Sequence, residues 1–92
     1  MAVEKRVPLL HRTGLHLRAA GRFAETAGRF EADVTLTVEG RSVNGKSVLE
    51  ILTLGAGPGV ELVISADGEG ETEAAESLER LVRDNFGETA AT

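Results

Sequence analysis

The chain has 92 residues, of which 41% are hydrophobic, with a formal net charge of −5 at pH 7 and no cysteine. These values predict one small globular domain over residues 1–88 with a short C-terminal tail at 89–92, and they exclude disulfides and cysteine metal sites. The negative charge argues against sequence-independent nucleic-acid binding. Without an apolar signal region or a bilayer-length apolar run, we expect a cytoplasmic protein that does not insert into membranes.

The first half of the chain predicts a strand, a helix and two further strands. Residues Val3 to Leu9 alternate loosely, which indicates a strand, and Pro8 predicts an edge position because proline cannot donate to a ladder. Apolar residues with helical spacing predict a helix from about Leu17 to Phe30. Asp33 to Val38 alternates cleanly, and a turn signal after it lets Arg41 to Val43 return as a short strand.

The second half predicts a short helix, a strand and a longer helix. Ser47 to Leu54 is a mostly apolar helical stretch, and Val60 to Ala66 alternates as a strand. Glu71 to Phe86 has the apolar stripe of a helix, with Gly87 as its expected C-cap and a frayed tail beyond. The order is βαββαβα, and every strand has one apolar and one polar face. We therefore predict an α+β fold whose antiparallel sheet is covered by helices on one side and open to water on the other.

His16, one of only two histidines, stands where a short loop runs into the first predicted helix, two residues before Arg18. A helix start offers unpaired N–H groups and a partial positive charge, which favour a phosphate. A neutral imidazole is a good nucleophile toward phosphorus, and Arg18 can stabilise the charged product. His16 is therefore a candidate phosphoryl acceptor, and the alternative that the pattern leaves open is a polar loop residue or an indifferent helix cap. His11 has no comparable partner, and we interpret it as a surface loop residue.

Ser47 to Glu50 fits the capping box S-x-x-E, which explains Ser47 as a helix cap. The same position would also favour a phosphate on the serine hydroxyl. A helix this short cannot bury apolar residues all round against one sheet. We therefore expect Leu49 and Leu52 to remain at the surface as a docking patch, unless loops fold over them.

Residues 40–47 match the phosphate-loop string G-x-x-x-x-G-K-[ST], and the strand ending near Asp67 resembles one that holds magnesium. Such a site needs a parallel sheet with long crossover connections, however, and Val43 alternates as a returning strand would. These two points argue against a nucleotide site, and a nucleotide-binding protein that uses Gly40 to Ser47 is kept as the enzyme alternative. Two histidines and no cysteine do not make a metal-ligand cluster, and we expect neither a metal nor a cofactor.

Two separated motifs of a known family occur in this chain in the right order. They are Gly14-Leu15-His16 with Arg18 and Ala20, then Val43-Asn44, Lys46-Ser47-Val48 and Leu54-Gly55. They resemble HPr, the histidine-containing phosphocarrier family of the bacterial phosphoenolpyruvate-dependent phosphotransferase system, over almost the whole chain. The resemblance implies an open-faced β-sandwich, with a four-stranded antiparallel sheet and three helices on one face.

The resemblance also implies a stoichiometric carrier rather than a catalyst. His16 would accept the phosphoryl group on Nδ1 from the system's first enzyme and pass it to an A-domain acceptor. Arg18 would hold the phosphate beside the main-chain N–H groups of Leu17 and Arg18. Ser47 corresponds to the serine that a regulatory kinase phosphorylates in many members, so a serine kinase and phosphorylase are candidate partners. The implied partner-binding residues of the monomer are Ala20, Lys46, Val48, Leu49 and Leu52.

Two positions depart from the family pattern. Leu17 stands where the family usually has alanine, and Ala19 where it usually has proline. Losing proline removes a fixed φ near the helix start, and Leu17 adds bulk beside His16. A regulatory HPr-like module that is not active in sugar uptake is therefore a second alternative.

Overall fold

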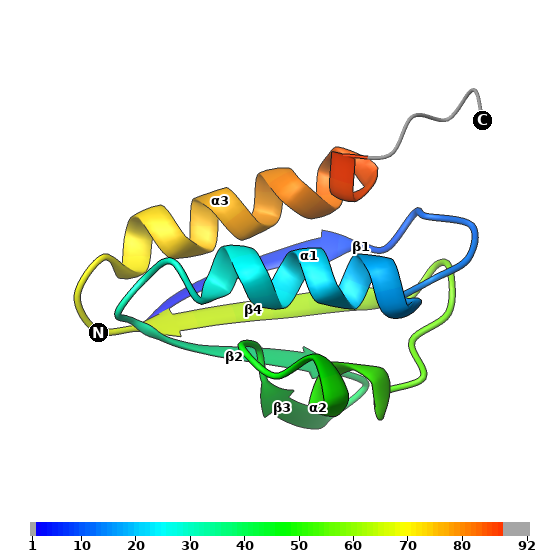
Figure 1. Cartoon of the computed structure of the whole chain (residues 1–92), viewed down its shortest axis with the longest axis horizontal. Helices are drawn as coiled ribbons and strands as arrows, with labels where there is room; N and C mark the ends of the chain where they lie inside the picture. Colours follow the sequence, from blue (N-terminus) through cyan, green and yellow to red (C-terminus); the bar gives the residue numbers. More distant parts are fainter. Residues whose placement is uncertain (1, 88–92) are drawn as a thin grey trace.

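The computed structural model describes residues 2–87 of the chain (Figure 1). The expected tail at 89–92 lies outside these residues. The elements follow the expected order, with one short 3-10 turn added at the end. They are β1 (Val3–Pro8), α1 (Leu17–Ala27), β2 (Asp33–Val38), β3 (Arg41–Asn44), α2 (Val48–Leu52), β4 (Glu61–Asp67), α3 (Glu71–Arg83) and η1 (Asn85–Gly87).

The four strands form one sheet in the order β1-β4-β2-β3, and all neighbouring strands are antiparallel. The predicted antiparallel sheet is confirmed. Strand β1 lies at one edge, so Pro8 occupies the edge strand that its missing N–H requires. The last strand in the chain, β4, lies between β1 and β2, so the first and the last strand are neighbours in the sheet.

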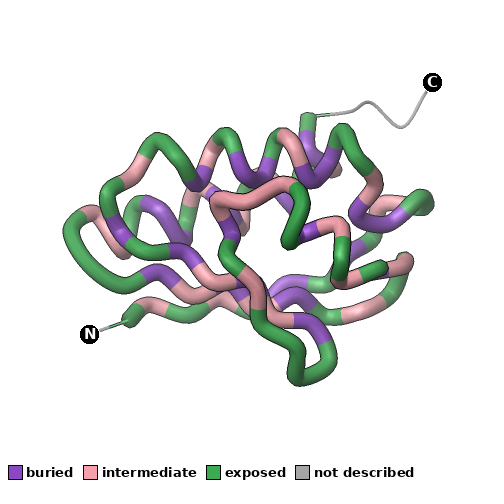
Figure 2. The backbone as a smooth tube through the Cα atoms, turned by 60° about the horizontal axis from the view of Figure 1, so that its bottom comes forward, coloured by how far each residue is buried: buried purple, intermediate pink, exposed green. Residues whose placement is uncertain are grey.

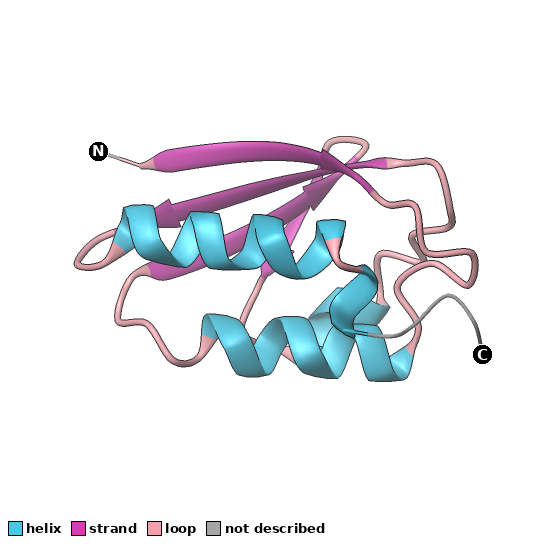
Figure 3. Cartoon of the chain, turned by 90° about the horizontal axis from the view of Figure 1, so that it is seen from above, coloured by secondary structure: helices cyan, strands magenta, loops and turns pink. Residues whose placement is uncertain are grey.

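The helices lie on one side of the sheet, as Figure 3 shows. Helices α1 and α3 cover the sheet, and α2 packs against α1 and β3 (Figure 1). Buried and exposed segments alternate along the strands (Figure 2), because successive side chains of a strand point to opposite faces. The largest buried side chains include Phe23, Leu36, Ile64 and Leu78.

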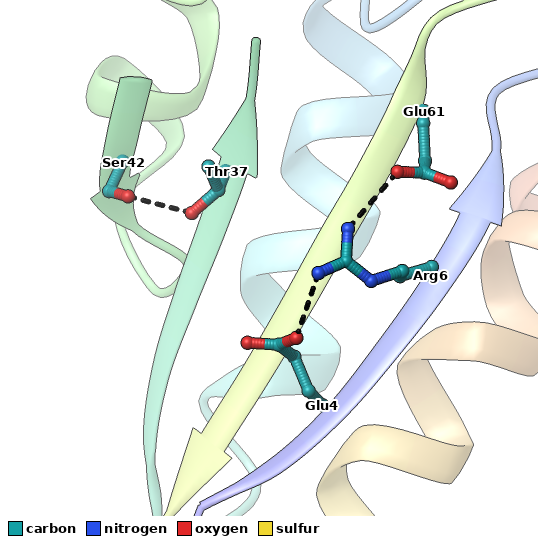
Figure 4. A network of polar contacts seen from close by, with 5 residues as sticks. All are labelled: Glu4, Arg6, Thr37, Ser42 and Glu61. Carbon is teal, nitrogen blue, oxygen red and sulfur yellow. Dashed lines mark hydrogen bonds and ion pairs between the residues drawn. The ribbon is translucent and has the colours of Figure 1, made fainter. Parts of the chain in front are cut away.

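Polar side chains lie on the face of the sheet that points away from the helices of residues 2–87 (Figure 3 and Figure 4). The Arg6 guanidinium lies 3.3 Å from a carboxylate oxygen of Glu4 and 3.3 Å from one of Glu61. The Thr37 and Ser42 hydroxyl oxygens lie 2.7 Å apart across β2 and β3. These groups remain solvated or paired with one another, so this face has no need of a covering layer. The open-faced architecture is therefore confirmed.

Both long helices end before their predicted boundaries. Helix α1 ends at Ala27 rather than Phe30, because Gly28 follows as its C-cap. Helix α3 ends at Arg83 with Asp84 as its C-cap, so the predictions of a helix to Phe86 and of a Gly87 cap were wrong.

Phe86 instead has a φ of +57°, a conformation that bulky residues rarely adopt. Its side chain is fully buried, and its carbonyl accepts a hydrogen bond from the Arg22 guanidinium at 3.1 Å. These two contacts hold the turn against the strain. Figure 1 shows that they place η1 at the same end of the molecule as the start of α1.

We predict that Gly14→Ala destabilises the fold by about 2 kcal/mol or more. Gly14 has a φ of +68°, and a Cβ there would collide with the carbonyl oxygen of Ala56. Urea unfolding measures the change. The matched control is Gly21→Ala inside α1, where a Cβ meets nothing within 4 Å. That control should gain about 0.5–1 kcal/mol, since alanine favours a helix. Unchanged stability of Gly14→Ala would contradict the proposed close approach.

Candidate functional site

Three segments meet at one end of the sheet: the loop between β1 and α1, the loop between α2 and β4, and η1 (Figure 1). Leu9 exchanges backbone hydrogen bonds with the second loop, at 2.8 Å with Val60 and 2.7 Å with Gly59. The Leu15 N–H donates to the Ala56 carbonyl at 3.0 Å. The residues that lead into α1 are therefore held from the side by a distant part of the chain.

His16 is the N-cap of α1, and Leu17 is its first helical residue, as predicted. The backbone of His16 is extended, with φ −77° and ψ 178°. Its Nδ1 accepts hydrogen bonds from the N–H groups of Arg18, at 3.2 Å, and Ala19, at 3.5 Å. The ring is half-buried, so it remains accessible from solvent. The imidazole thus presents Nδ1 to the first turn of the helix.

This geometry determines which nitrogen is available for chemistry. An Nδ1 that accepts hydrogen bonds carries no proton, so the neutral ring has its proton on Nε2. Nδ1 is therefore the ring nitrogen whose lone pair could act as a nucleophile, and the hydrogen bonds to it are long, at 3.2 and 3.5 Å. The first turn of α1 carries no acidic side chain. An anion attached to Nδ1 would meet N–H donors and the positive end of the helix dipole, in a turn that has no acidic side chain of its own.

The residues predicted beside His16 occupy different parts of the first turn. The Arg18 side chain is exposed, and that of Leu17 is 67% exposed. Leu17 and Arg18 were expected to supply the phosphate-binding N–H groups. In the free protein the N–H groups of Arg18 and Ala19 donate to Nδ1, because a capping side chain reaches the second and third helical N–H groups.

His11 lies next to His16, which was not predicted. The centroids of the two rings are 4.9 Å apart, with an angle of 54° between their planes. The Thr13 N–H donates to His11 Nδ1 at 3.3 Å, and the Thr13 hydroxyl oxygen lies 2.8 Å from the same nitrogen. The expected loop position is correct, but the ring is half-buried rather than isolated on the surface. The one feature of the sequence that could have indicated this proximity is Gly14, because a turn at that glycine brings the chain back on itself between His11 and His16.

Ser47 caps α2 as predicted, since its hydroxyl accepts the Glu50 N–H at 3.2 Å. The reciprocal half of the capping box is not formed. The Glu50 carboxylate accepts from the Asn44 N–H at 3.0 Å instead of reaching the Ser47 N–H. Ser47 itself is half-buried. Its hydroxyl therefore has a clear structural task, and it also lies where an added phosphate would face a helix start.

The predicted docking patch is only partly exposed. Leu49 is 78% exposed, whereas Val48 and Leu52 are half-buried and pack against the core. Leu10 is 71% exposed in the loop after β1, and it was not predicted. Leu10 and Leu17 are thus two exposed apolar side chains that lie within a few residues of His16 in the sequence.

Two of the predicted partner-binding residues, Ala20 and Lys46, make contacts inside the fold. Ala20 is fully buried on the inner face of α1, so the prediction that it contacts a partner was wrong. The helical period places it on the side of the core, two residues from the exposed Arg18. The Lys46 ammonium donates to the Phe30 carbonyl at 2.8 Å, which ties the chain before α2 to the segment after α1.

The structure contradicts the nucleotide-binding alternative. Residues 41–44 are strand β3, paired antiparallel with β2, and do not form a phosphate-wrapping loop. The following helix has only five residues. Within residues 2–87, no group of three histidine, aspartate or glutamate side chains could hold a metal ion. No helix in the same range is long and apolar enough to cross a membrane.

The chain matches a protein-family model described as "PTS HPr component phosphorylation site" over residues 3–84. It is 34% identical to phosphocarrier protein HPr of Neisseria meningitidis serogroup A, over 94% of this chain and 97% of that protein. It is 40% identical to the phosphocarrier protein HPr of Vibrio cholerae, over 86% of this chain and 93% of that protein. The crystal structure of HPr-C-His from Thermoanaerobacter tengcongensis matches with a TM-score of 0.90 at 34% identity, covering 95% of this chain and 98% of that one.

We predict that Ser47→Ala lowers the free energy of unfolding by about 1 kcal/mol, because the Glu50 N–H loses its acceptor. Urea unfolding monitored by circular dichroism measures the change. Ser47→Asp keeps a capping oxygen and is expected to retain stability close to that of the original protein. Equal losses in both variants would argue against the cap.

Proposed function

Because the chain belongs to the HPr family of phosphotransferase-system components, we propose that it is a stoichiometric phosphoryl carrier with Nδ1 of His16 as the acceptor. The phosphoryl group derives from phosphoenolpyruvate, arrives from the system's first enzyme and leaves to an A-domain acceptor. The observation that carries the proposal is the orientation of His16, whose Nδ1 meets the N–H groups of Arg18 and Ala19. The proposal retains the expected cytoplasmic location and monomeric state.

The transfer step follows from this geometry. The Nδ1 lone pair forms a bond to phosphorus while the bond between phosphorus and the donor on the first enzyme breaks. The proton on Nε2 stays in place, and no electrons are exchanged with a redox partner. The N–H groups of Arg18 and Ala19 then donate to phosphoryl oxygens instead of Nδ1, and the Arg18 guanidinium adds a charge-assisted contact. The same donors therefore serve the free and the phosphorylated forms.

Docking in this proposal uses the exposed apolar side chains of Leu17 and Leu49 around the acceptor. A carrier must bind two different proteins briefly, which suits a small interface. Ser47 begins the helix that presents Leu49, so a phosphate on its hydroxyl would add charge to this surface. That arrangement supports regulation by a serine kinase and phosphorylase.

A second candidate is a regulatory member of the family whose His16 is not phosphorylated in cells. The departures at Leu17 and Ala19 favour it, since the exposed Leu17 side chain next to His16 narrows the choice of partners. The two candidates differ in one measurable respect. A carrier acquires an acid-labile phosphate, whereas the regulatory module does not.

We predict that His16→Ala abolishes phosphoryl acceptance. The protein is incubated with phosphoenolpyruvate and the first enzyme, and the acid-labile phosphate is quantified and mapped. Arg29→Ala is the matched control, because Arg29 is exposed, lies beyond the last residue of α1 and pairs only loosely with Glu25 at 3.9 Å. The control should accept phosphate at the original rate. Acceptance that survives in His16→Ala would refute the assignment of the acceptor.

We predict that Ser47→Asp slows phosphoryl transfer by about tenfold through a higher KM, since the carboxylate places charge at the docking surface. Ser47→Ala, which adds no charge, should keep the original transfer kinetics despite its lower stability. Initial rates at increasing carrier concentration separate KM from kcat. Identical kinetics in the two variants would show that Ser47 lies outside the interface.

A further inference from the structure

We propose that His11 is a positioning residue, whose ring packs against the His16 imidazole and keeps Nδ1 directed toward the first turn of α1. This inference rests on the carrier function proposed above. The central observation is the separation of 4.9 Å between the two ring centroids, with a tilt of 54°. Tilted aromatic rings at this separation attract one another. His16 therefore has an aromatic neighbour that limits how its ring turns.

His11 is itself held in place. The Thr13 N–H donates to His11 Nδ1, and the Thr13 hydroxyl lies within hydrogen-bond distance of the same nitrogen. The Gly14 N–H donates to the His11 carbonyl at 2.9 Å, which closes a tight turn between the two histidines. Side chain and backbone are thus both fixed by the loop that leads to His16.

Phe86 also packs against His11, with a ring-centroid separation of 6.2 Å and an angle of 60° between the ring planes. The side chain of Phe86 is fully buried, and its carbonyl is held by the Arg22 guanidinium at 3.1 Å. Since Arg22 belongs to α1, the helix that His16 caps also anchors the backbone of Phe86. His11 is thus a ring neighbour of both Phe86 and His16.

The two hydrogen bonds to Nδ1 of His16 are long, at 3.2 and 3.5 Å, and each therefore restrains the ring only weakly. A rotated ring would direct Nδ1 away from the donors that stabilise a phosphoryl group. Misplacement of a reacting atom by about 1 Å can cost up to about 100-fold in rate. Neighbour packing that prevents rotation raises the rate without touching the phosphorus.

The test compares His11→Phe, which keeps a ring and loses the nitrogens, with His11→Ala, which loses both. We expect His11→Ala to slow phosphoryl acceptance by about tenfold. His11→Phe should stay within about twofold of the original rate. In the free protein, the 15N NMR signals of the His16 ring should shift toward averaged tautomers in His11→Ala and remain unaveraged in His11→Phe. Thermal unfolding of both variants checks that the fold is intact.

Two outcomes would overturn the proposal: equal loss of rate in His11→Phe and His11→Ala, or unchanged rate and NMR signals in His11→Ala. If His11→Ala does not fold, His11→Leu replaces it, because leucine keeps apolar bulk beside His16 but has no ring. His11→Leu should then show a smaller shift of the His16 signals in the same direction, and no shift would count against the proposal. The NMR measurement needs no phosphoryl donor. Failure of the original protein to accept phosphate would therefore refute the carrier function separately.

Discussion

The hydrogen bonds from the first turn of α1 to Nδ1 of His16 are the contacts on which the site depends. A capping residue satisfies helix N–H groups that would otherwise lack an intrahelical partner. In the proposed carrier, the capping atom is also the nucleophile, so the free ring is oriented by the same donors that a phosphoryl group would use. The protein needs no pocket for this chemistry, because the donors belong to the backbone and move only as the helix moves.

The rest of the fold holds this helix start in place. Backbone hydrogen bonds from Leu9 and Leu15 fix the approach to His16 against the loop between α2 and β4, and Gly14 permits the close passage beside Ala56. The uncovered sheet face is polar and takes no part in the site (Figure 4). Helix α2 is short, so Leu49 remains exposed at its surface. A rigid scaffold thus presents a shallow acceptor with apolar side chains nearby, which suits brief contact with more than one protein.

Much of the architecture could be predicted because it follows from local patterns. Strict alternation from Asp33 to Val38 allows only a strand with one buried face, and the helical period after His16 allows only a helix that begins there. The pattern of apolar residues predicted the wrong boundary where tertiary contacts determine the local conformation. It extended α3 to Phe86, because a buried phenylalanine fits an apolar stripe equally well inside a helix or in a turn beyond it. The family resemblance, in turn, assigned Ala20 to a partner surface, although the helix buries that residue.

The sequence by itself determined the element order, the location of the cap at His16 and the presence of a guanidinium two residues later. These features depend on residues close together in the chain, where spacing is enough to specify geometry. Only the tertiary structure showed that the rings of His11, His16 and Phe86 are neighbours and that the Lys46 ammonium donates a hydrogen bond to the Phe30 carbonyl. Phe86 lies far from the two histidines in sequence, and its approach to His11 depends on how β1, α1 and the end of α3 pack around one core.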